Sequence, residues 1–240
     1  SSVPKIGAFA LIARLFLDAL NAMSDYWSIL ILSAGLSSII IGNLIALMQI
    51  NLRRMLAYSA IGHIGFVLLS FSLTSDTGIT ASLTYLLMYL IMTIAAFSLI
   101  ESIASDDHQL IELGDLKGLS RSNPLIAFML LFCMFSMVGI PPFIGFYAKW
   151  IVLTELINSN YIWLAMVGII MSVIAAYYYL RIVWFMYFEN SDSPIKNNGI
   201  KNSQAITSIL ISLMLLIIGL YPNPIFDYTR LIISSFILID

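Results

Sequence analysis

Residues 125–157 read LIAFMLLFCMFSMVGIPPFIGFYAKWIVLTELI. This stretch is apolar almost throughout. Its 33 residues would make an α-helix of about 50 Å, whereas the hydrocarbon core of a membrane is about 30 Å thick. The centre of the stretch contains Gly139, Pro141 and Pro142. We therefore expect one membrane-crossing helix that is discontinuous at residues 139–142.

The two prolines supply the physical reason for a break. Proline has no N–H and its ring clashes with the carbonyl group four residues earlier, so the carbonyls of Met137 and Val138 lose their helical partners. In hydrocarbon such groups persist only where they are buried in protein or line a water-filled cavity, and broken helices of this kind mark substrate or ion paths in transporters. The alternative is an ordinary proline kink in a tilted helix.

The composition extends this prediction to the whole chain. Of the 240 residues, 60% are hydrophobic and 10% are charged, whereas soluble domains carry roughly 25% charged residues. The apolar runs are continuous over about 20 residues, which is typical of membrane-spanning helices and not of the alternation in a β-barrel. The sequence predicts an all-α integral membrane protein with seven transmembrane helices, at residues 3–20, 27–50, 55–73, 79–100, 125–157, 161–188 and 203–221.

Lysine and arginine are distributed unevenly between the predicted loops. The loops on one side contain Arg53, Arg54, Lys117, Arg121, Lys196 and Lys201, whereas those on the other side contain none before Arg230. The positive-inside rule places the first side, with the chain start, in the cytoplasm or mitochondrial matrix and the C-terminus on the opposite side. The net charge of −2 offers no basic patch for nucleic acid. Because Ser1 follows neither an initiator methionine nor a signal peptide, we expect a longer parent protein.

Lys149 lies in the second half of the discontinuous helix, about 12 Å from its predicted end. Placing a lysine near the middle of a membrane costs at least about 2.5 kcal/mol, and such residues usually face the interior of a helix bundle and carry function. Lys149 is therefore the first candidate for a proton-carrying group. The alternative is a lysine whose apolar stem lets its ammonium group reach the membrane surface.

Two further ionisable side chains in predicted spans are candidates for the same role. Lys5 follows Pro4 in the first span, where a functional position at depth and a surface-reaching position are both open. His63 lies about 13 Å into the third span, with Ser59 near its face, and is either a neutral core residue or a titrating group. One ionisable residue in each of several neighbouring spans suits a proton relay.

The sequence lacks motifs for bond chemistry. It has no glycine-rich phosphate loop, and its single Cys133 excludes a disulfide framework and a cysteine-ligated cluster. We therefore expect no cofactor and no redox chemistry in this chain. The acidic loop between residues 101 and 123 has no regular ligand spacing, so we expect a solvated loop without a metal; it contains Asp106, Asp107, His108, Glu112 and Asp115.

Several segments resemble a known family. Residues 42–66, GNLIALMQINLRRMLAYSAIGHIGF, and residues 139–149, GIPPFIGFYAK, are similar to the antiporter-like membrane subunits of respiratory complex I. The segments DLKGL at 115–119 and YYYLR at 177–181 match as well, so the resemblance covers nearly the whole chain. The family has three such sibling subunits. One of them has glutamate at the position of Lys149, and two have histidine within the helix that holds residues 85–90. This chain therefore most resembles the sibling that has neither feature.

The resemblance implies a parent of fourteen helices that contains two inverted five-helix repeats. Residues 1–20 would be the last helix of a truncated first repeat. Residues 27–188 would form the second repeat, with its broken helix at 125–157. Residues 203–221 would be the final transmembrane helix, and residues 224–239 a short amphipathic C-terminal segment.

The resemblance also implies a function, proton translocation within NADH:quinone oxidoreductase. Lys149 would match the lysine that ends the outer half-channel and Lys5 the linking lysine of the eighth helix. His63 would lie in the polar axis between them, with Ser59 and Tyr89 as candidates to support the relay. NADH, FMN, iron–sulfur clusters and quinone are expected in partner subunits, and other membrane subunits, including antiporter-like siblings, as partners. The implied location is the bacterial plasma membrane or the mitochondrial inner membrane.

Two other functions remain open. A component of a multisubunit cation/proton antiporter shares these motifs, and sodium-dependent exchange without quinone reductase partners would select it. A non-conducting membrane scaffold fragment would have no use for Lys149 or the broken helix, and would tolerate Lys149→Leu without functional loss.

Overall fold

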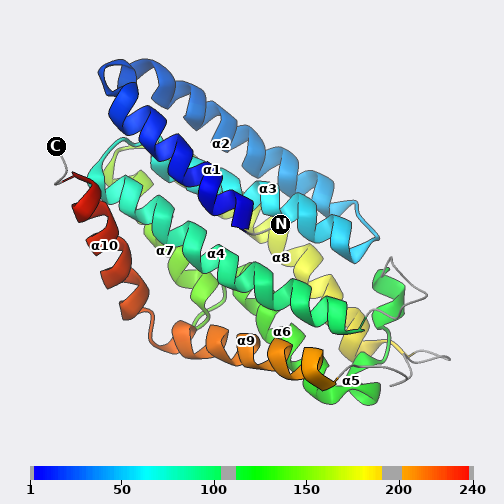
Figure 1. Cartoon of the computed structure of the whole chain (residues 1–240). Helices are drawn as coiled ribbons and strands as arrows, with labels where there is room; N and C mark the ends of the chain where they lie inside the picture. Colours follow the sequence, from blue (N-terminus) through cyan, green and yellow to red (C-terminus); the bar gives the residue numbers. More distant parts are fainter. Residues whose placement is uncertain (1–2, 104–111, 191–201, 238–240) are drawn as a thin grey trace.

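The computed structural model describes residues 3–103, 112–190 and 202–237, which are helical nearly throughout (Figure 1). In these ranges the only β-type pairing is an isolated bridge between Asn51 and Glu112. This part of the chain is therefore all-α, as predicted. The helices are α1 Val3–Ala13, α2 Ser24–Leu47, α3 Leu52–Phe71, α4 Asp76–Ile103, α5 Leu119–Ser122, α6 Pro124–Val138, α7 Ile144–Asn158, α8 Ile162–Phe188, α9 Asn202–Leu220 and α10 Asn223–Ile237.

Four helices in the described ranges are long and apolar enough to cross a membrane. They are α3, α4, α8 and the helical segment Asn21–Leu47, which contains α2. The α9 and α10 segments would add a fifth as one bent span, because an angle of 83° separates them at a short break. Each half of the interrupted 125–157 stretch has 15 residues, α6 before the interruption and α7 after it.

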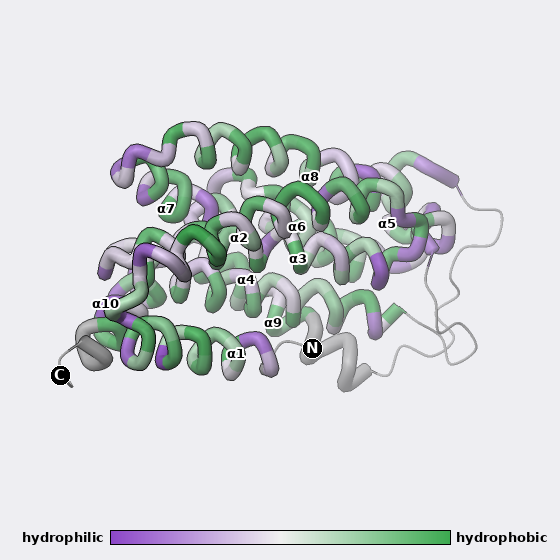
Figure 2. Tube along the Cα trace, turned by 90° about the horizontal axis from the view of Figure 1, so that it is seen from above, coloured by the Kyte–Doolittle hydropathy of each residue, from purple (hydrophilic) through white to green (hydrophobic). Residues whose placement is uncertain are grey.

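Helix α4 is the centre of the bundle. It contacts α3, α6, α7, α9 and α10. In its most apolar 18-residue window, 72% of the residues are buried, compared with 33% for α2 and for α8. Figure 2 shows hydrophobic residues along the lengths of the helices and hydrophilic residues mainly towards the ends of the bundle. The peripheral helices therefore present apolar surfaces that suit a lipid environment.

Glycines permit the close packing of α2 on α3. A Cβ atom on Gly42 would lie 2.6 Å from the backbone nitrogen of Gly62, and a Cβ atom on Gly62 would lie 2.8 Å from Nδ2 of Asn43. No larger side chain fits between these backbones without movement. The same arrangement brings Asn43 of α2 against α3.

One predicted boundary was wrong. Residues 51–54, expected as a loop, form the cap and first turn of α3, because the side-chain oxygen of Asn51 accepts a 3.0 Å hydrogen bond from the N–H of Arg54. The first predicted span is α-helical only to Ala13 and continues as a π-helical turn, Arg14–Ala19.

Two ion pairs tie segments together around the loops between the helices. Arg53 pairs with Glu101 at 2.8 Å, and Lys117 pairs with Glu189 at 2.7 Å. A guanidinium nitrogen of Arg181 also donates to the backbone carbonyl of Gln49, just beyond the end of α2. The first contact joins α3 to α4. The second joins the residue after α8 to the segment before α5, and the third joins α8 to the segment before α3.

Part of the acidic loop has a structural role. The backbone N–H of Glu112 donates to Oδ2 of Asp115 at 2.8 Å, and the two side chains form a capping box for a short 3₁₀ helix, Leu113–Leu116. Asp106, Asp107 and His108 lie outside the described residues, as do Lys196 and Lys201. In the described ranges no group of three or more His, Cys, Asp or Glu side chains could hold a metal ion.

Candidate functional site

The interruption of the long apolar stretch begins at Gly139. Helix α6 ends at Val138, and Gly139 takes a left-handed conformation with φ of 88°. The N–H of Ile140 donates to the carbonyl of Phe135 at 3.2 Å and that of Gly139 to Ser136 at 3.0 Å. This is the Schellman arrangement of helix ends. The helix thus already ends before the two prolines, which lie between it and the start of α7 at Ile144.

The second half of the stretch packs directly against the first. A Cβ atom on Gly145 would overlap the carbonyl oxygen of Ser136, and the N–H of Gly145 donates to Oγ of Ser136 at 3.4 Å. Glycine is therefore the residue that permits this approach. One helical turn later, Lys149 lies opposite the open end of α6.

Lys149 is buried, with 8% of its surface exposed. Its Nζ atom donates a 2.7 Å hydrogen bond to the carbonyl oxygen of Val138. A Cβ atom on Gly139 would lie only 3.0 Å from Cδ of Lys149, so the lysine stem lies along the break. A carbonyl that loses its helical partner at the break is thus paired with the ammonium group of Lys149.

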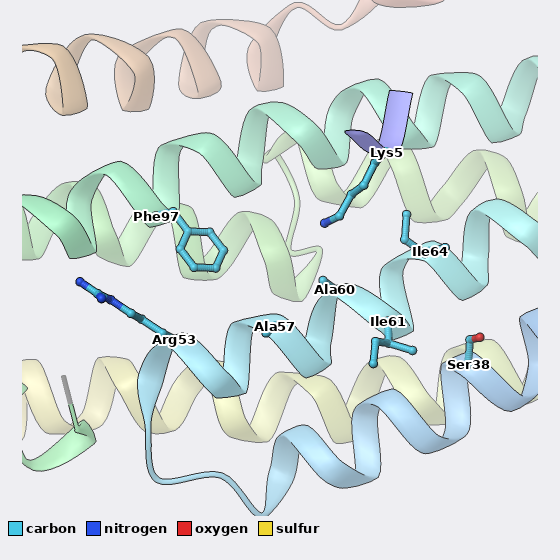
Figure 3. Close-up of a pocket in the computed structure, with 8 residues that line it drawn as sticks. All are labelled: Lys5, Ser38, Arg53, Ala57, Ala60, Ile61, Ile64 and Phe97. Atoms are coloured by element: carbon cyan, nitrogen blue, oxygen red, sulfur yellow. The ribbon is translucent and has the colours of Figure 1, made fainter. Parts of the chain in front are cut away.

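Lys5 approaches the same bundle from α1. It is half-buried, and its Nζ atom donates to the hydroxyl oxygen of Tyr89 at 3.2 Å while lying 4.8 Å from the centre of the tyrosine ring. Figure 3 shows Lys5 extending between α3 and α4 into a cavity of about 520 Å³. Arg53 and Phe97 also line this cavity. Lys5 therefore lies at the wall of a cavity that is lined mainly by apolar side chains.

His63 lies at the centre of an aromatic cluster. It is 6% exposed, and its ring stacks on that of Tyr89, with centroids 4.7 Å apart and an interplanar angle of 22°. Its Nδ1 atom lies 2.9 Å from the hydroxyl oxygen of Tyr85 on α4, and its Nε2 atom lies 3.1 Å from that of Tyr179 on α8. Three helices thus fix one imidazole ring.

The two tyrosine hydroxyls suit either protonation state of His63. Neutral imidazole has one donor and one acceptor nitrogen, and imidazolium has two donors. A hydroxyl group both donates and accepts, so each nitrogen keeps a partner when the ring gains or loses a proton. Each ring nitrogen of His63 therefore has a hydrogen-bond partner in either protonation state.

Other polar side chains surround this cluster. Ser59, 2% exposed, donates to the carbonyl of Leu56 at 2.8 Å within its own helix. The hydroxyl of Tyr178 donates to Oδ1 of Asn43 at 2.9 Å, and Nδ2 of Asn43 donates to the carbonyl of Ile39 at 2.7 Å. His63, Asn43 and Lys149 line a common small cavity. A row of polar groups therefore runs through the apolar bundle from Lys5 to Lys149.

Sequence reasoning missed four of the nine side chains in this row. It singled out Lys5, Tyr89, Ser59, His63 and Lys149, but assigned no such role to the four residues that contact these side chains or one another. The spacing of Tyr85 and Tyr89, four residues apart on one helical face, was a usable signal. The other three missed residues are Asn43, Tyr178 and Tyr179.

Comparison with known proteins gives a family match over most of the chain. Residues 1–175 match the family described as NADH:quinone oxidoreductase/Mrp antiporter, transmembrane. The chain is 40% identical over 222 residues to NADH-quinone oxidoreductase subunit N of Hydrogenovibrio crunogenus, covering 92% of this chain and 46% of that protein. It is 39% identical over 231 residues to subunit N of Acidithiobacillus ferrooxidans, covering 95% and 47%. The chain spans about half the length of the curated relatives it matches.

Solved structures share the fold. A chain of the Mrp complex from a Dietzia species superposes with a TM-score of 0.82 at 22% identity, over 95% of this chain and 50% of that chain. A chain of respiratory complex I from Thermus thermophilus with bound aureothin superposes with a TM-score of 0.70 at 29% identity, over 82% and 44%. The predicted resemblance to antiporter-like membrane subunits is confirmed by these matches.

Proposed function

The chain belongs to the transmembrane family shared by NADH:quinone oxidoreductases and Mrp antiporters, and from this premise we propose that it translocates protons as part of subunit N of an NADH:quinone oxidoreductase. The redox reaction takes place in other subunits. This chain supplies a path for protons and performs no electron transfer of its own.

The observation that carries the proposal is the row of polar side chains inside an apolar bundle. Lys5, His63 and Lys149 are the proton-relay residues, with Tyr89 between the first two. Ionisable residues at membrane depth are unfavourable unless they serve a function, and here each has a specific partner. Ser59 supports the row from the turn of α3 that precedes His63.

The relay works by shifting charge along this row. Redox chemistry elsewhere changes the local electrostatics, and a proton moves from Lys5 through the His63 cluster to Lys149, which releases it on the outer side. Tyr89 and His63 are joined by ring stacking, which carries no proton, so we propose that a water molecule carries the proton across this step. Because like charges along the row repel, the titrations of its members are coupled.

The break at Gly139, Pro141 and Pro142 gives Lys149 its place in the relay. The open end of α6 offers a carbonyl dipole to the ammonium group and leaves room for the side chain to lie across the bundle. Discontinuous helices serve the same purpose in other transporters.

The finer architecture follows the family. We propose seven membrane crossings, with residues 27–188 as one five-helix repeat and residues 1–20 as the last helix of a preceding repeat. Residues 203–221 are the final crossing, followed by the amphipathic segment 224–239. The excess of lysine and arginine on one side places the chain start in the cytoplasm or matrix. Because the matched relatives are bacterial, the bacterial inner membrane is the favoured location.

Partner subunits complete the enzyme. NADH, FMN, iron–sulfur clusters and quinone belong to them, and the antiporter-like siblings flank this chain in the membrane. The exposed apolar side chains of α2 and α8 suit contact with such subunits or with lipid, among them Leu30, Ile41, Ile170, Val173 and Trp184.

A second function is favoured by one observation. The family that matches residues 1–175 is described as NADH:quinone oxidoreductase/Mrp antiporter, so it includes both kinds of protein. A component of a multisubunit cation/proton antiporter would use the same relay with a cation in exchange. Sodium-dependent proton movement in the absence of NADH oxidation would select this function, whereas proton movement that requires NADH oxidation would select the first.

The decisive experiment replaces Lys149 with alanine in the parent complex. Proton translocation per NADH oxidised is measured in membrane vesicles, together with the amount of assembled complex. The matched control is Lys117→Ala, which removes a lysine from an ion pair with Glu189 that is worth about 0–1 kcal/mol. Loss of translocation in the first variant alone supports the relay. Unchanged translocation with normal assembly would leave the chain a membrane scaffold.

A further inference from the structure

Ser172 is an exception among the helical serines. Most of them donate to a carbonyl of the preceding turn, as Ser59 does to Leu56 at 2.8 Å and Ser82 to Ile79 at 2.7 Å. Ser172 lies in the middle of α8, yet its Oγ atom is buried and has no hydrogen-bond partner. In the described ranges Nε of Arg181 is the only other buried side-chain polar atom without a hydrogen-bond partner. A buried hydroxyl without a partner requires a physical reason.

The reason lies in the cavity that Ser172 lines. This cavity of about 10 Å³ is bordered by Asn43, His63, Lys149 and Ser172, with Gly62, Phe66 and Ala175 as apolar walls. Its size is at the lower end of the ~10–15 Å³ that one water molecule needs. The cavity therefore has room for one water molecule and no more.

The polar groups of the cavity have unused hydrogen-bonding capacity. Nζ of Lys149 has three hydrogens, one of which is used by the carbonyl of Val138. Asn43 uses one of its two amide hydrogens on Ile39 and accepts one hydrogen bond from Tyr178. Together with the hydroxyl of Ser172, these groups offer three partners, which is the typical number for a buried water molecule.

We propose that Ser172 holds a single ordered water molecule that connects the His63 cluster to Lys149. This inference rests on the proposed function and adds to it a positioning residue and a ligand site. Both nitrogens of His63 are already paired with tyrosine hydroxyls, so the imidazole makes no direct hydrogen bond to Lys149. The water molecule fills the gap between these two groups.

The position of the water defines its task. It accepts a hydrogen bond from Lys149 and exchanges hydrogen bonds with Ser172 and Asn43, which orients it beside the imidazole ring. Once Lys149 has released its proton, the water donates to the neutral amine instead: an O–H bond of the water breaks as an N–H bond forms at Nζ of Lys149, and the water oxygen takes a proton from the His63 cluster. No bond other than O–H and N–H forms or breaks, and the number of protons in the row is conserved.

The first test is structural and does not depend on activity. The parent complex is determined at a resolution that shows ordered water. We expect density within hydrogen-bonding distance of both Oγ of Ser172 and Nζ of Lys149. A hydroxyl that instead donates to the carbonyl of Gly168, one turn earlier, beside an empty cavity would overturn the proposal.

The second test uses variants in the parent complex. Ser172→Ala removes the hydroxyl and keeps the space, and we expect proton translocation to fall about threefold to tenfold, the rate equivalent of one lost hydrogen bond. Ser172→Thr keeps the hydroxyl and should restore most of the rate. The matched control is Ser82→Ala, because the hydroxyl of Ser82 is also buried, in α4, but bonds to its own helix.

The outcomes separate this proposal from the proposed function. If Lys149→Ala abolishes translocation and Ser172→Ala behaves like Ser82→Ala, the relay stands and the water site is wrong. If Lys149→Ala leaves translocation unchanged, the relay fails, and the density beside Ser172 alone decides whether the water site exists. Loss in both variants, with rescue by Ser172→Thr, supports both.

Discussion

Nζ of Lys149 donates a 2.7 Å hydrogen bond to the carbonyl oxygen of Val138, the last residue of α6. The two residues lie on opposite sides of the interrupted helix. Pro142 follows Val138 by four residues and cannot donate to this carbonyl in a helix, so the ammonium group takes the place of the missing N–H. The ammonium also lies at the negative end of the α6 dipole. This contact therefore gives the free carbonyl at the break a hydrogen-bond partner. It also holds the buried charge that the proposed relay requires.

The variant Lys149→Arg tests whether the relay needs only a positive charge at this position or a group that also releases a proton. A guanidinium group keeps the charge and the donors, so the hydrogen bond to Val138 and assembly of the complex should persist, but it does not release its proton in proteins. We expect proton translocation to be lost almost as fully as in Lys149→Ala. Proton uptake by vesicles during NADH oxidation measures this, with Lys117→Arg as the control that keeps the rate. Normal translocation in Lys149→Arg would show that this residue does not load and release protons.

Gly139→Ala should destabilise the break. Gly139 has φ of 88°, and an added Cβ atom would lie 3.0 Å from Cδ of Lys149. The left-handed conformation alone costs alanine about 1–2 kcal/mol. The free energy of unfolding in a denaturant titration measures the loss. Gly114→Ala is the matched control, since a Cβ atom there meets nothing within 4 Å. Equal stability of the two variants would contradict the strain assigned to Gly139.

His63→Leu should leave two buried hydroxyls without their imidazole partner. Tyr85 and Tyr179 are 1% and 0% exposed, but Tyr179 keeps side-chain hydrogen bonds to Ser59 and Tyr178, so Tyr85 is the hydroxyl left unpaired and we expect a loss of about 1–3 kcal/mol. Thermal unfolding measures it. The double variant Tyr85→Phe with His63→Leu should regain part of the loss, because the unpaired hydroxyl is then absent. No recovery would indicate that the loss arises from packing of the ring.

Tyr89→Phe should slow proton translocation with little effect on stability. The variant keeps the ring that stacks on His63 and removes the oxygen that accepts from Lys5 at 3.2 Å. We expect a loss of stability of about 0.5–1.5 kcal/mol, the net value of one hydrogen bond. Translocation and thermal unfolding are measured together. The control is Tyr177→Phe, whose side chain is 62% exposed. Similar translocation rates in the two variants would remove Tyr89 from the relay.

The sequence alone determined the class of the protein and the main elements of the row. Its hydropathy required helices in a membrane, and α2, α3, α4 and α8 lie close to the predicted spans. The length of residues 125–157 and their central glycine and prolines predicted the region where the structure ends α6. The rise of a helix predicted that Lys149 and His63 lie deep in their spans. These features are local, because they depend on the order of residues along one helix.

Only the tertiary structure decided which groups meet. His63 bonds to tyrosines 22 and 116 residues away, and Lys149 bonds across a break whose geometry depends on how α7 packs on α6. A helical pattern specifies which face of a helix is buried, but not which neighbour covers that face or at what height. Hydrogen bonds require agreement within a few tenths of an ångström. The partners of His63, the carbonyl that receives Lys149 and the unpaired hydroxyl of Ser172 therefore follow from the packing of the bundle.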